Sequence, residues 1–331
     1  MVSDLQNTQR FTLHSSLFTL HSFVMSQYIL RRFLQMIPIT FGILTLVFSL
    51  IHMIPGDPAV QIAGESARPE DVAAVRKALG LDQPLWTQYV HYVTHVVRGD
   101  FGTSFQTNLS VADQIKQRYP ATIELAMGSM FIALIVAFPL GIISAIYRNS
   151  WIDNVARFFA LIGVSMPSFL FGPLLIIAFA INHEWFPVSG RDAGLRSLVL
   201  PSVTMGLALS AILTRMIRIS LADELTQLYV TTAVAKGVTR ARAIFRHALK
   251  NALIPVITVL ALQFGSLLTG AIITEQIFSW PGLGRLLLTS ISNRDYPQVQ
   301  ASILVIALTY ILVNFASDLL YGVVDPRIKL E

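Results

Sequence analysis

The sequence predicts an all-α, polytopic membrane protein with six transmembrane helices. Of the 331 residues, 54% are hydrophobic and only 13% are charged, against about 25% charged residues in an ordinary globular domain. A soluble chain of this length would need far more charge to cover its surface. The hydrophobic residues also gather in six long runs, and a helix needs a run of about 20 apolar residues to cross the hydrocarbon core of a bilayer.

Each of the six runs lacks Asp, Glu, Lys and Arg over a length that can span a bilayer. The predicted spans are Phe33–Ile54, Leu125–Tyr147, Phe158–Asn182, Ser197–Thr214, Asn251–Thr274 and Tyr296–Ser317. The first belongs to an N-terminal segment, residues 25–54. The other five form a transmembrane core over residues 120–331.

Several predicted spans contain proline, which membrane helices tolerate because neighbouring groups satisfy the backbone atoms that proline frees. The third span holds two, Pro167 and Pro173. We therefore expect this span to be kinked or broken. The kink either gates a pathway or only shapes the packing.

Residues 1–24 fit no predicted element and contain the pentapeptide FTLHS twice, at Phe11–Ser15 and Phe18–Ser22. They do not show a clean signal-peptide pattern. Met25 opens a more conventional start, with two arginines before the first apolar run. We interpret residues 1–24 as an additional N-terminal tail or a mis-called start.

The net charge of +5 is better explained by membrane topology than by nucleic-acid binding, because the basic residues lie between apolar runs and not on one stripe. Lys and Arg are enriched in the cytoplasmic loops of membrane proteins. With a cytoplasmic N-terminus, the connection after the fourth span lies inside with Arg215, Arg218, Lys236, Arg240, Arg242, Arg246 and Lys250. The sequence therefore predicts that both termini are cytoplasmic.

In this topology residues 55–119 form a large extracytoplasmic loop between the first two spans. A short amphipathic helix is predicted over Asp71–Leu79, with Gly80 suited to end it. An aromatic helix is predicted over Pro84–Val97 and carries Trp86. This second helix either lies over the mouth of a pathway or against a partner, or it forms a packed cap without a gating role.

The connection between the fourth and fifth spans contains a helix–glycine–helix element at residues 221–250. Leu221–Lys236 is predicted to be helical, Gly237 to end that helix and Thr239 to be the N-cap of the next one. In the second helix, apolar residues recur at the spacing of one helical face, at Ala241, Ile244, Phe245, Ala248 and Leu249. The opposite face is basic, with Arg240, Arg242, Arg246 and Lys250.

Two functions fit such a basic, amphipathic element. It can lie on anionic lipid headgroups, as many basic helices do. It can instead be a rigid element that docks into a cytoplasmic partner and passes movement to the spans. The periodicity alone does not separate these two functions.

No motif for catalysis, nucleotide binding or metal binding is present in the sequence. There is no GxxxxGK[ST] phosphate loop and no GxSxG motif, and His183-Glu184 lacks the second histidine of a zinc-protease helix. The absence of cysteine excludes a thiol nucleophile and a Cys-ligated metal. The sequence therefore predicts that the chain is not an enzyme and binds no cofactor or metal itself.

Ionisable residues near the spans are functional candidates by default in a membrane protein. Glu124, Glu275 and His52 lie near span ends, where we expect water to reach them. Asp318, near the cytoplasmic end of the last span, is expected to pair with an arginine, and a role in transport stays open. The alternative function, an ion-coupled secondary transporter, would need a charged pair at mid-depth, which the sequence does not show.

Two runs in the helix–glycine–helix element resemble the cytoplasmic signature of ABC importer permeases: YVTTAVAKG at Tyr229–Gly237 and RHALKNALIPV at Arg246–Val256. Other runs resemble the dipeptide/oligopeptide branch of that family, whose members also handle nickel complexes and glutathione. These runs are HMIPGDP (52–58), LGLDQP (79–84), GDFG (99–102), FSWPGLGR (278–285), RDYP (294–297) and DPR (325–327). The resemblance extends over nearly the whole chain from Met25.

The resemblance implies a type I ABC importer-like permease that moves di- or oligopeptides or related small solutes by alternating access. The coupling residues that it implies are Ala233, Ala235, Lys236, Gly237, Val238, Thr239, Arg240 and Arg242. The signature usually starts Glu-Ala-Ala, and this chain has Thr231-Thr232-Ala233 there, so no role of that glutamate carries over. The candidates for the pathway or its gate are Pro167, Pro173, Trp86 and Asp318.

The same resemblance implies the partners and the location. The partners are a second homologous permease subunit, two ATP-hydrolysing subunits that bind ATP and Mg²⁺ at the cytoplasmic face, an extracytoplasmic solute-binding protein and the lipid bilayer. No nucleic-acid partner is expected. The location is the bacterial inner membrane. In such systems the binding protein does most of the selection, so peptides are preferred here by their frequency in the branch.

Overall fold

The structure, a computed structural model, describes residues 27, 29–50, 52–53, 58–63, 67–78 and 80–324. Within these ranges every regular element is a helix, as the composition predicts. The tail at residues 1–24, Leu79, most of the HMIPGDP run and the DPR run lie outside the described residues.

Five helices in the described part of the chain are long and apolar enough to cross a membrane, and there are up to six if one bent pair counts as a single span. The five are the first helix (Ile29–Leu50), α5 (Val111–Ile146), α8 (Leu195–Glu224), the continuous helix that ends as α11 (Leu249–Ile277) and α13 (Tyr296–Val324). The bent pair is α6 (Trp151–Ser165) followed by α7 (Ser168–Leu175) and a π-helical turn (Ile176–Ile181). Each predicted span coincides with one of these elements, and the third is the bent pair.

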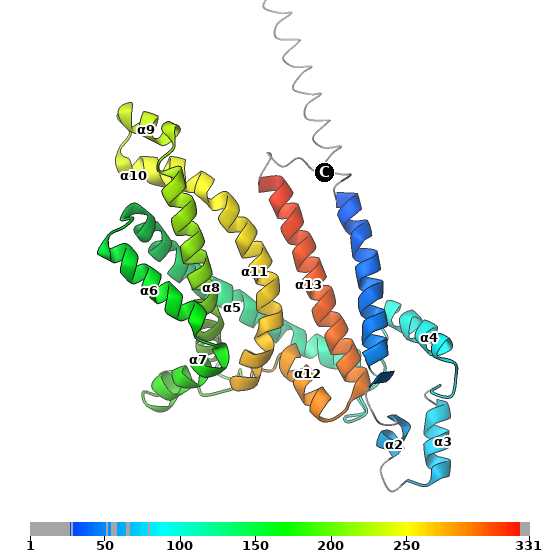
Figure 1. The fold of residues 1–331 in the computed structure, drawn as a ribbon. Coiled ribbons are helices and arrows are strands. Elements are labelled where there is room, and N and C mark those ends of the chain that lie inside the picture. Colours follow the sequence, from blue (N-terminus) through cyan, green and yellow to red (C-terminus); the bar gives the residue numbers. More distant parts are fainter. Residues whose placement is uncertain are drawn as a thin grey trace, which may run out of the picture.

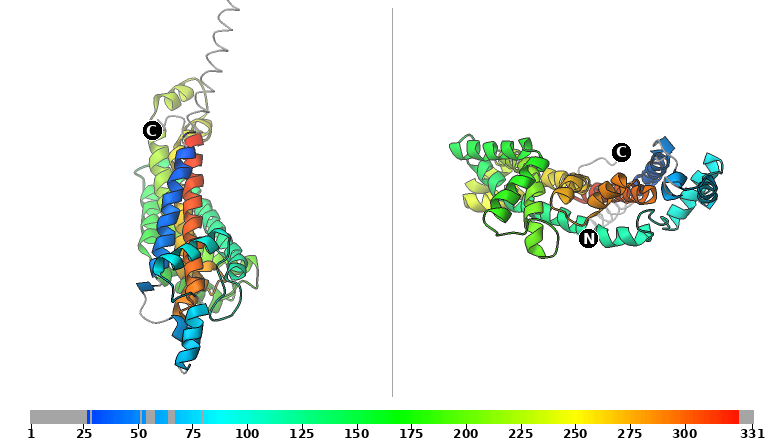
Figure 2. Two further views of the ribbon diagram at one scale, coloured as in Figure 1. Left: turned by 90° about the vertical axis from the view of Figure 1, so that its right-hand side faces the viewer. Right: turned by 90° about the horizontal axis from the view of Figure 1, so that it is seen from below.

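The remaining helices are short, and Figure 1 shows them at the two ends of the bundle. Those at one end are α2 (Pro58–Ala63), α3 (Pro69–Ala78) and α4 (Leu85–Val97). At the other end α9 (Leu228–Ala235) and α10 (Arg240–Arg242) lie on the same side as the start of the first helix and the end of α13. Seen from below, the chain is much wider than it is thick (Figure 2).

Between the first helix and α5, the structure follows the two predicted helices closely. Gly80 comes two residues after the end of α3 and has φ +67°. Helix α4 ends at Val97, and its C-cap Arg98 leads into a turn at Gly99. Helix α5 begins at Val111, within the predicted loop 55–119, and the extent of that loop stays a prediction. Ser110 caps that helix by accepting a hydrogen bond from the Asp113 N–H.

The core of the bundle lies where α5 crosses α8. Leu125 on α5 and Leu213 on α8 are completely buried there. The two backbones approach closely because glycine occupies the contact: a Cβ on Gly206 would lie 2.6 Å from the Ser129 carbonyl oxygen, and one on Gly141 2.8 Å from Ile217. Small residues at helix contacts are typical of membrane bundles, where close backbone packing replaces the hydrophobic drive.

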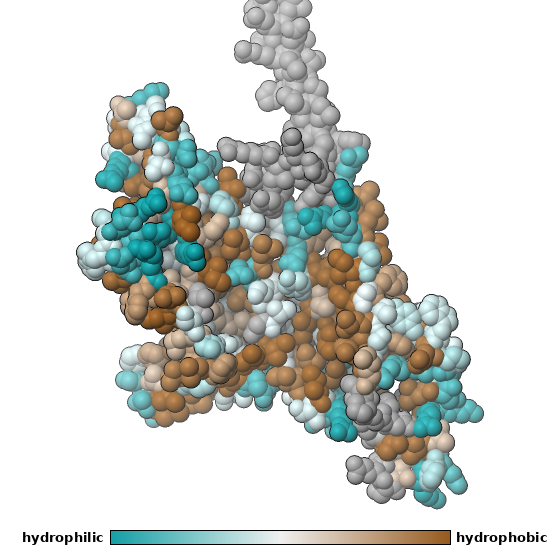
Figure 3. Space-filling model, viewed as in Figure 1, coloured by the Kyte–Doolittle hydropathy of each residue, from teal (hydrophilic) through white to brown (hydrophobic). Residues whose placement is uncertain are grey.

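Large apolar side chains cover much of the outside of the bundle. Figure 3 shows hydrophobic residues across the middle of one face and hydrophilic residues gathered towards its ends. Phe131 on α5 and Leu161 on α6 are more than half exposed. A monomeric soluble protein rarely exposes such an area, whereas lipid or a partner subunit covers it in a membrane.

Candidate coupling and translocation sites

The helix–glycine–helix element begins with a break that the sequence does not reveal. Helix α8 continues to Glu224, a turn follows, and α9 covers only Leu228–Ala235. The prediction of one helix over Leu221–Lys236 is therefore wrong. The Leu225 and Gln227 N–H groups bond back to the carbonyls of Leu221 and Glu224, so the chain turns without a glycine or proline.

Gly237 ends α9 as predicted. Its φ is +89°, a value that glycine adopts without the steric cost of a side chain. The Val238 N–H donates to the Ala233 carbonyl over 3.1 Å and the Gly237 N–H to the Val234 carbonyl over 2.9 Å. This pair of bonds defines a Schellman cap, which fixes the direction in which the chain leaves the helix.

Thr239 stands at the N-cap position of the next helix, as predicted, but its side chain makes no capping hydrogen bond. Helix α10 continues through a π-helical turn at Ala243–Ala248 directly into α11. The predicted short second helix is therefore the end of a membrane-spanning helix. No loop separates this element from α11.

The element rests on a small apolar core of its own. Val230 from α9 and Ala243 and Ala248 from the π-helical turn are buried against Leu221 of α8. The Tyr229 hydroxyl donates to Glu224 and accepts from the Asn251 amide at 3.0 Å. Burial and the nearby Glu224 carboxylate raise the pKa of the Tyr229 phenol above its ordinary value. These contacts join α8, α9 and α11 at one point.

The predicted apolar face is only partly buried. Ile244 is buried, and Ala248 and Leu249 pack into the core, but Ala241 is exposed and Phe245 is 57% exposed. The reason is that the buried face also includes Ala243, which the helical spacing did not select. Of the implied coupling residues, Ala233 and Val238 are half-buried, and the exposed ones are Ala235, Lys236, Gly237, Thr239, Arg240 and Arg242.

The third span is broken, as the sequence predicts, and the break lies at Pro167. The two arms of the span, Trp151–Gly163 and Ser168–Ile181, meet at 101°. Met166 has extended backbone angles, φ −86° and ψ 116°, because a residue before proline is disfavoured in the helical region. Pro173 lies inside α7, so it is Pro167 that makes the break.

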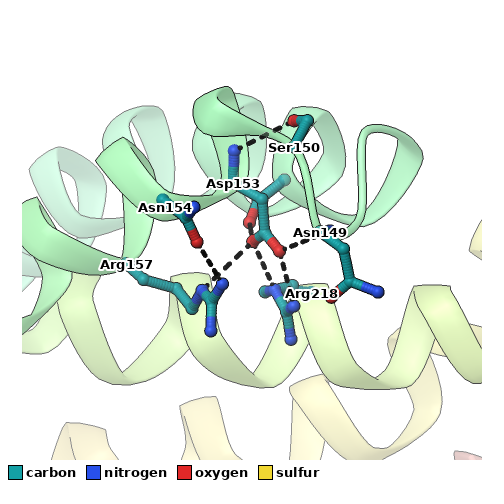
Figure 4. A network of polar contacts seen from close by, with 7 residues as sticks. Asn149, Ser150, Asp153, Asn154, Arg157 and Arg218 are labelled. Atoms are coloured by element: carbon teal, nitrogen blue, oxygen red, sulfur yellow. Dashed lines mark hydrogen bonds and ion pairs between the residues drawn. The ribbon is translucent and has the colours of Figure 1, made fainter.

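A buried carboxylate that the sequence reasoning missed connects the start of α6 to α8. Figure 4 shows Asp153 with Arg218, whose Nε and Nη2 donate to the two carboxylate oxygens at 2.6 and 2.7 Å. The Ser144 hydroxyl and the Asn149 N–H also donate to Asp153. Asp153 has no exposed surface, so a fork of two bonds from arginine balances its charge in the interior.

A second buried carboxylate contradicts an expectation. Glu275 was expected to meet water at a span end, but it is completely buried. Its oxygens accept from the Thr122 hydroxyl at 2.7 Å and from the Arg285 N–H at 3.0 Å. The cause is α12 (Leu283–Ser292), which folds back over α11 and places its first turn on Glu275. A Cβ on Gly282 would lie 2.1 Å from the carboxylate, so glycine is required there.

Two further candidates have clear positions. Trp86 is 73% exposed, while its neighbour Tyr89 packs α4 against the first helix through a 2.7 Å hydrogen bond to Thr45. Beside them a cavity of about 370 Å³ lies between the first helix, α4 and the start of α13, and Trp86 does not line it. Asp318 pairs with Arg32 at 3.1 Å, which confirms the expected arginine partner.

Long apolar helices around a common core, with a capped and partly basic element at one end, define a polytopic membrane protein. The chain belongs to the family described as binding-protein-dependent transport system inner membrane component, whose sequence model matches residues 137–330. The model of the N-terminal part of such membrane components matches residues 25–126. The chain is therefore a permease subunit of an ABC importer in the peptide, nickel and glutathione branch.

Known proteins agree with this assignment. The chain is 44% identical over 307 residues to the glutathione transport system permease protein GsiC of Escherichia coli K12, covering 93% of this chain and all of that protein. The same protein of Salmonella typhi is 43% identical over the same length. Among solved structures, inward-facing forms of the MetNI methionine ABC transporter match with TM-scores of 0.55 and 0.53, at 16% and 17% identity, over 64% of this chain and 96% of that chain. The structural match shows the fold alone.

Membership of this family settles the broad class. The family is a membrane component and not a catalytic subunit, so ATP and Mg²⁺ act through partner subunits. It implies a partner permease, ATPase subunits and a binding protein, and a multi-pass location in the bacterial inner membrane. A secondary transporter is not favoured.

Proposed function

We propose that this chain imports short peptides, the solute class that includes glutathione, and that residues 228–250 couple it to its ATPase partners. In this proposal the exposed end of the element, Ala235–Arg242, seats in a groove of an ATP-hydrolysing subunit. Closure of the ATPases pushes α9 and α10, and the push reaches the spans through α11. The carrying observation is that Gly237 caps α9 and that the helix that begins three residues later, at Arg240, is continuous with a spanning helix.

The direction in which the apolar residues point supports docking over lipid binding. A helix that lies on a membrane surface turns its apolar face to the lipid. In this element Ala243 and Ala248 face inward, against α8 and α9. The exposed surface combines the basic Lys236, Arg240 and Arg242 with the large apolar Phe245, a mixture that suits a protein groove.

The proposal places both termini and the coupling element in the cytoplasm. The described ends of the chain lie at the same end of the bundle as α9 and α10 (Figure 1), and the positive-inside rule favours that end for the cytoplasm. The opposite end, with α2, α3 and α4, then faces the binding protein. Trp86 is exposed there and is free to contact it.

Alternating access needs a part of the chain that has two arrangements, and a ligand or ATP must favour one of them. The bend at Pro167 is the proposed site of this change, because Met166 and Pro167 join two short helices without a continuous backbone ladder. Arg218 and Asp153 hold the first arm to α8. The second arm, α7, is then the arm that is freer to move.

The proposed solute rests on the relatives. The Escherichia coli and Salmonella permeases that match this chain over their full length are named for glutathione transport. Glutathione is a peptide with amide groups, so short peptides are the class that includes it. Residues of the described part of the chain provide no cluster of side chains that could hold a metal ion, and a bare metal as solute has no support.

The test uses the chain assembled with its partner permease, ATPases and binding protein in proteoliposomes. We expect uptake of radiolabelled glutathione or alanyl-alanine, and we expect it to require ATP on the side of the membrane where the ATPases lie. It should stop when the ATPase active site is disabled and persist when a protonophore collapses the proton gradient. Uptake that follows the gradient and ignores the ATPase would contradict the mechanism. ATP-driven uptake of a nickel complex but of neither peptide would contradict the solute class.

A further inference from the structure

A cavity of about 260 Å³ opens between α7, α8 and α11, inside the membrane-spanning part of the chain. Its walls are the start of α7, the middle of α8 and the second half of α11. The residues that line it are Ser168, Thr204, Met205, Ala208, Leu209, Ile212, Gln263, Ser266, Leu267 and Thr274. The lining contains hydroxyl and amide groups but no charged side chain.

Four of the polar side chains that line this cavity lack hydrogen-bond partners among the described residues. Thr274 is completely buried, and its hydroxyl oxygen has no partner among the described residues. Over the same part of the chain, no side-chain hydrogen bond is found for the Gln263 amide or for the hydroxyls of Ser168 and Ser266. Of these groups only Thr274 is buried, while Gln263 and Ser168 are half-buried and Ser266 is exposed. A buried polar group without a partner costs about 1–3 kcal/mol, so the Thr274 hydroxyl calls for a partner that comes and goes.

Hydroxyls that do have a partner show the contrast, and one of them, Thr204, lines the same cavity. Thr204 on α8 donates to the Leu200 carbonyl at 2.8 Å, and Thr258 and Thr269 on α11 donate to carbonyls of their own helix. This internal bond is the usual way in which a membrane helix satisfies a hydroxyl. Thr274 does not use it, although it lies on the same helix.

The chemistry of the lining selects one kind of ligand group. Hydroxyls and a carboxamide both donate and accept hydrogen bonds, and they match the N–H and C=O groups of an amide. A free carboxylate or ammonium group would need a countercharge inside the membrane, and the cavity has none to give. The groups of a peptide that fit here are therefore its backbone amides and not its charged ends.

A second, apolar cavity lies on the other side of α8. It has a volume of about 310 Å³, is walled by residues such as Phe159, Phe171 and Leu207, and shares Thr204 and Ala208 with the polar cavity. The break in the third span borders both cavities, because Met166 lines the apolar cavity and Ser168 lines the polar one. A change of the bend at Pro167 would therefore alter both cavities together.

We propose that the cavity between α7, α8 and α11 is a transient binding site for the peptide backbone of the solute during its passage, with Thr274 and Gln263 as its main hydrogen-bonding groups. This inference rests on the proposed peptide transport. It adds that the permease itself contacts the amide groups of any peptide, while the separate binding protein recognises the other groups of the peptide.

The first test replaces the polar groups by side chains of similar shape in the assembled transporter. In proteoliposomes with binding protein and ATP, Thr274→Val and Gln263→Met should each lower uptake of radiolabelled glutathione or alanyl-alanine by about 5- to 10-fold, because each removes a hydrogen bond made only in passage. The control is Thr269→Val on the same helix, whose hydroxyl bonds to its own helix. It should transport like the parent chain.

Uptake is expressed per complex, with the second permease that co-purifies as the measure of assembly. A loss that persists per complex supports the site. A loss that disappears on this normalisation means that the polar groups bind the partner permease, and normal uptake by both variants means that they contact no solute; either result overturns the inference. A parent transporter that imports no peptide would instead show that the proposed solute class is wrong.

The second test does not depend on activity and uses the absence of cysteine from the chain. Gln263→Cys introduces a single thiol that a charged, membrane-impermeant methanethiosulfonate should label from the aqueous pathway. Alanyl-alanine, which has no thiol to consume the reagent, should slow that labelling at least about 3-fold when it is supplied with binding protein and ATP, as expected for an occupied site. Thr269→Cys is the control, whose labelling the peptide should not change. Equal labelling of Gln263→Cys with and without the transported peptide would overturn the site.

Discussion

The two ends of the bundle each contain a carboxylate with no exposed surface, and the two are stabilised in different ways. Asp153 receives a fork of two hydrogen bonds from the Arg218 guanidinium. Glu275 accepts from a hydroxyl and a backbone N–H, while the Arg285 guanidinium donates to the Ser279 carbonyl and not to the carboxylate. One carboxylate is half of an ion pair, and the other is a helix cap.

The difference shows what each group is suited to hold. The Asp153 pair connects two helices that are far apart in the sequence, and α6 cannot leave α8 without breaking it. Glu275 lies at the N-terminus of α12, where the free N–H groups and the helix dipole favour a negative charge. The first contact therefore fixes the span before the bend, and the second fixes the short helix that folds back at the opposite end.

Breaking the ion pair should have the largest effect on stability. Arg218→Met leaves the Asp153 charge buried without its main partner, and we expect a loss of about 3–5 kcal/mol in the free energy of unfolding. Thermal unfolding of the purified chain in detergent measures it. Adding Asp153→Asn to this variant should recover most of the loss, because no buried charge then remains. A double variant as unstable as the single one would show that the charge pair is not what holds α6.

Removing the charge of Glu275 should cost less. Glu275→Gln keeps the acceptor for Thr122 but turns an NH₂ group towards the Arg285 N–H, and we expect a loss of about 1–3 kcal/mol. The matched control is Glu124→Gln, because Glu124 pairs with Arg191 and is partly exposed, so that its change should stay below about 1 kcal/mol. Equal losses for the two variants in the same unfolding measurement would mean that burial of Glu275 is not what matters.

The partly exposed pair of Asp318 and Arg32 should have the smallest effect. Their side chains are 31% and 42% exposed, and an ion pair in that setting contributes about 0–1 kcal/mol. Asp318→Asn should therefore unfold at nearly the same temperature as the parent chain. It should also transport normally, which would answer the open question of its role. A loss of uptake at unchanged stability would make Asp318 part of the pathway.

The features that could be predicted from the sequence are local ones. Apolar runs predict spans because the free-energy cost of exposing a run to water depends on that run alone. Pro167 and Gly237 predict a break and a cap because their backbone constraints act within a few residues. The break after Glu224 could not be seen, because Leu225, Thr226 and Gln227 contain neither glycine nor proline.

The features that could not be predicted depend on contacts between distant segments. Asp153 and Arg218 lie 65 positions apart, and one sequence does not reveal which aspartate meets which arginine. Glu275 is buried because α12 folds back over it, whereas its position near a span end predicts contact with water. The sequence does not predict the exposure of Phe245 for a related reason. Helical spacing shows which residues share a face, but not how that face is rotated relative to α8 and α9.

The central claim, that the Gly237 cap passes force from the ATPases to the spans, is tested most directly by comparing two glycines with the same geometry. Gly237 and Gly99 both follow a helix at φ +89° and +77°, with the same pair of cap hydrogen bonds and open space around the Cβ position. They lie at opposite ends of the bundle. The ratio of peptide imported to ATP hydrolysed is measured for Gly237→Val and Gly99→Val in the assembled transporter. We predict that membrane insertion is normal in both and that the ratio collapses only for Gly237→Val; an unchanged ratio in that variant would contradict the claim.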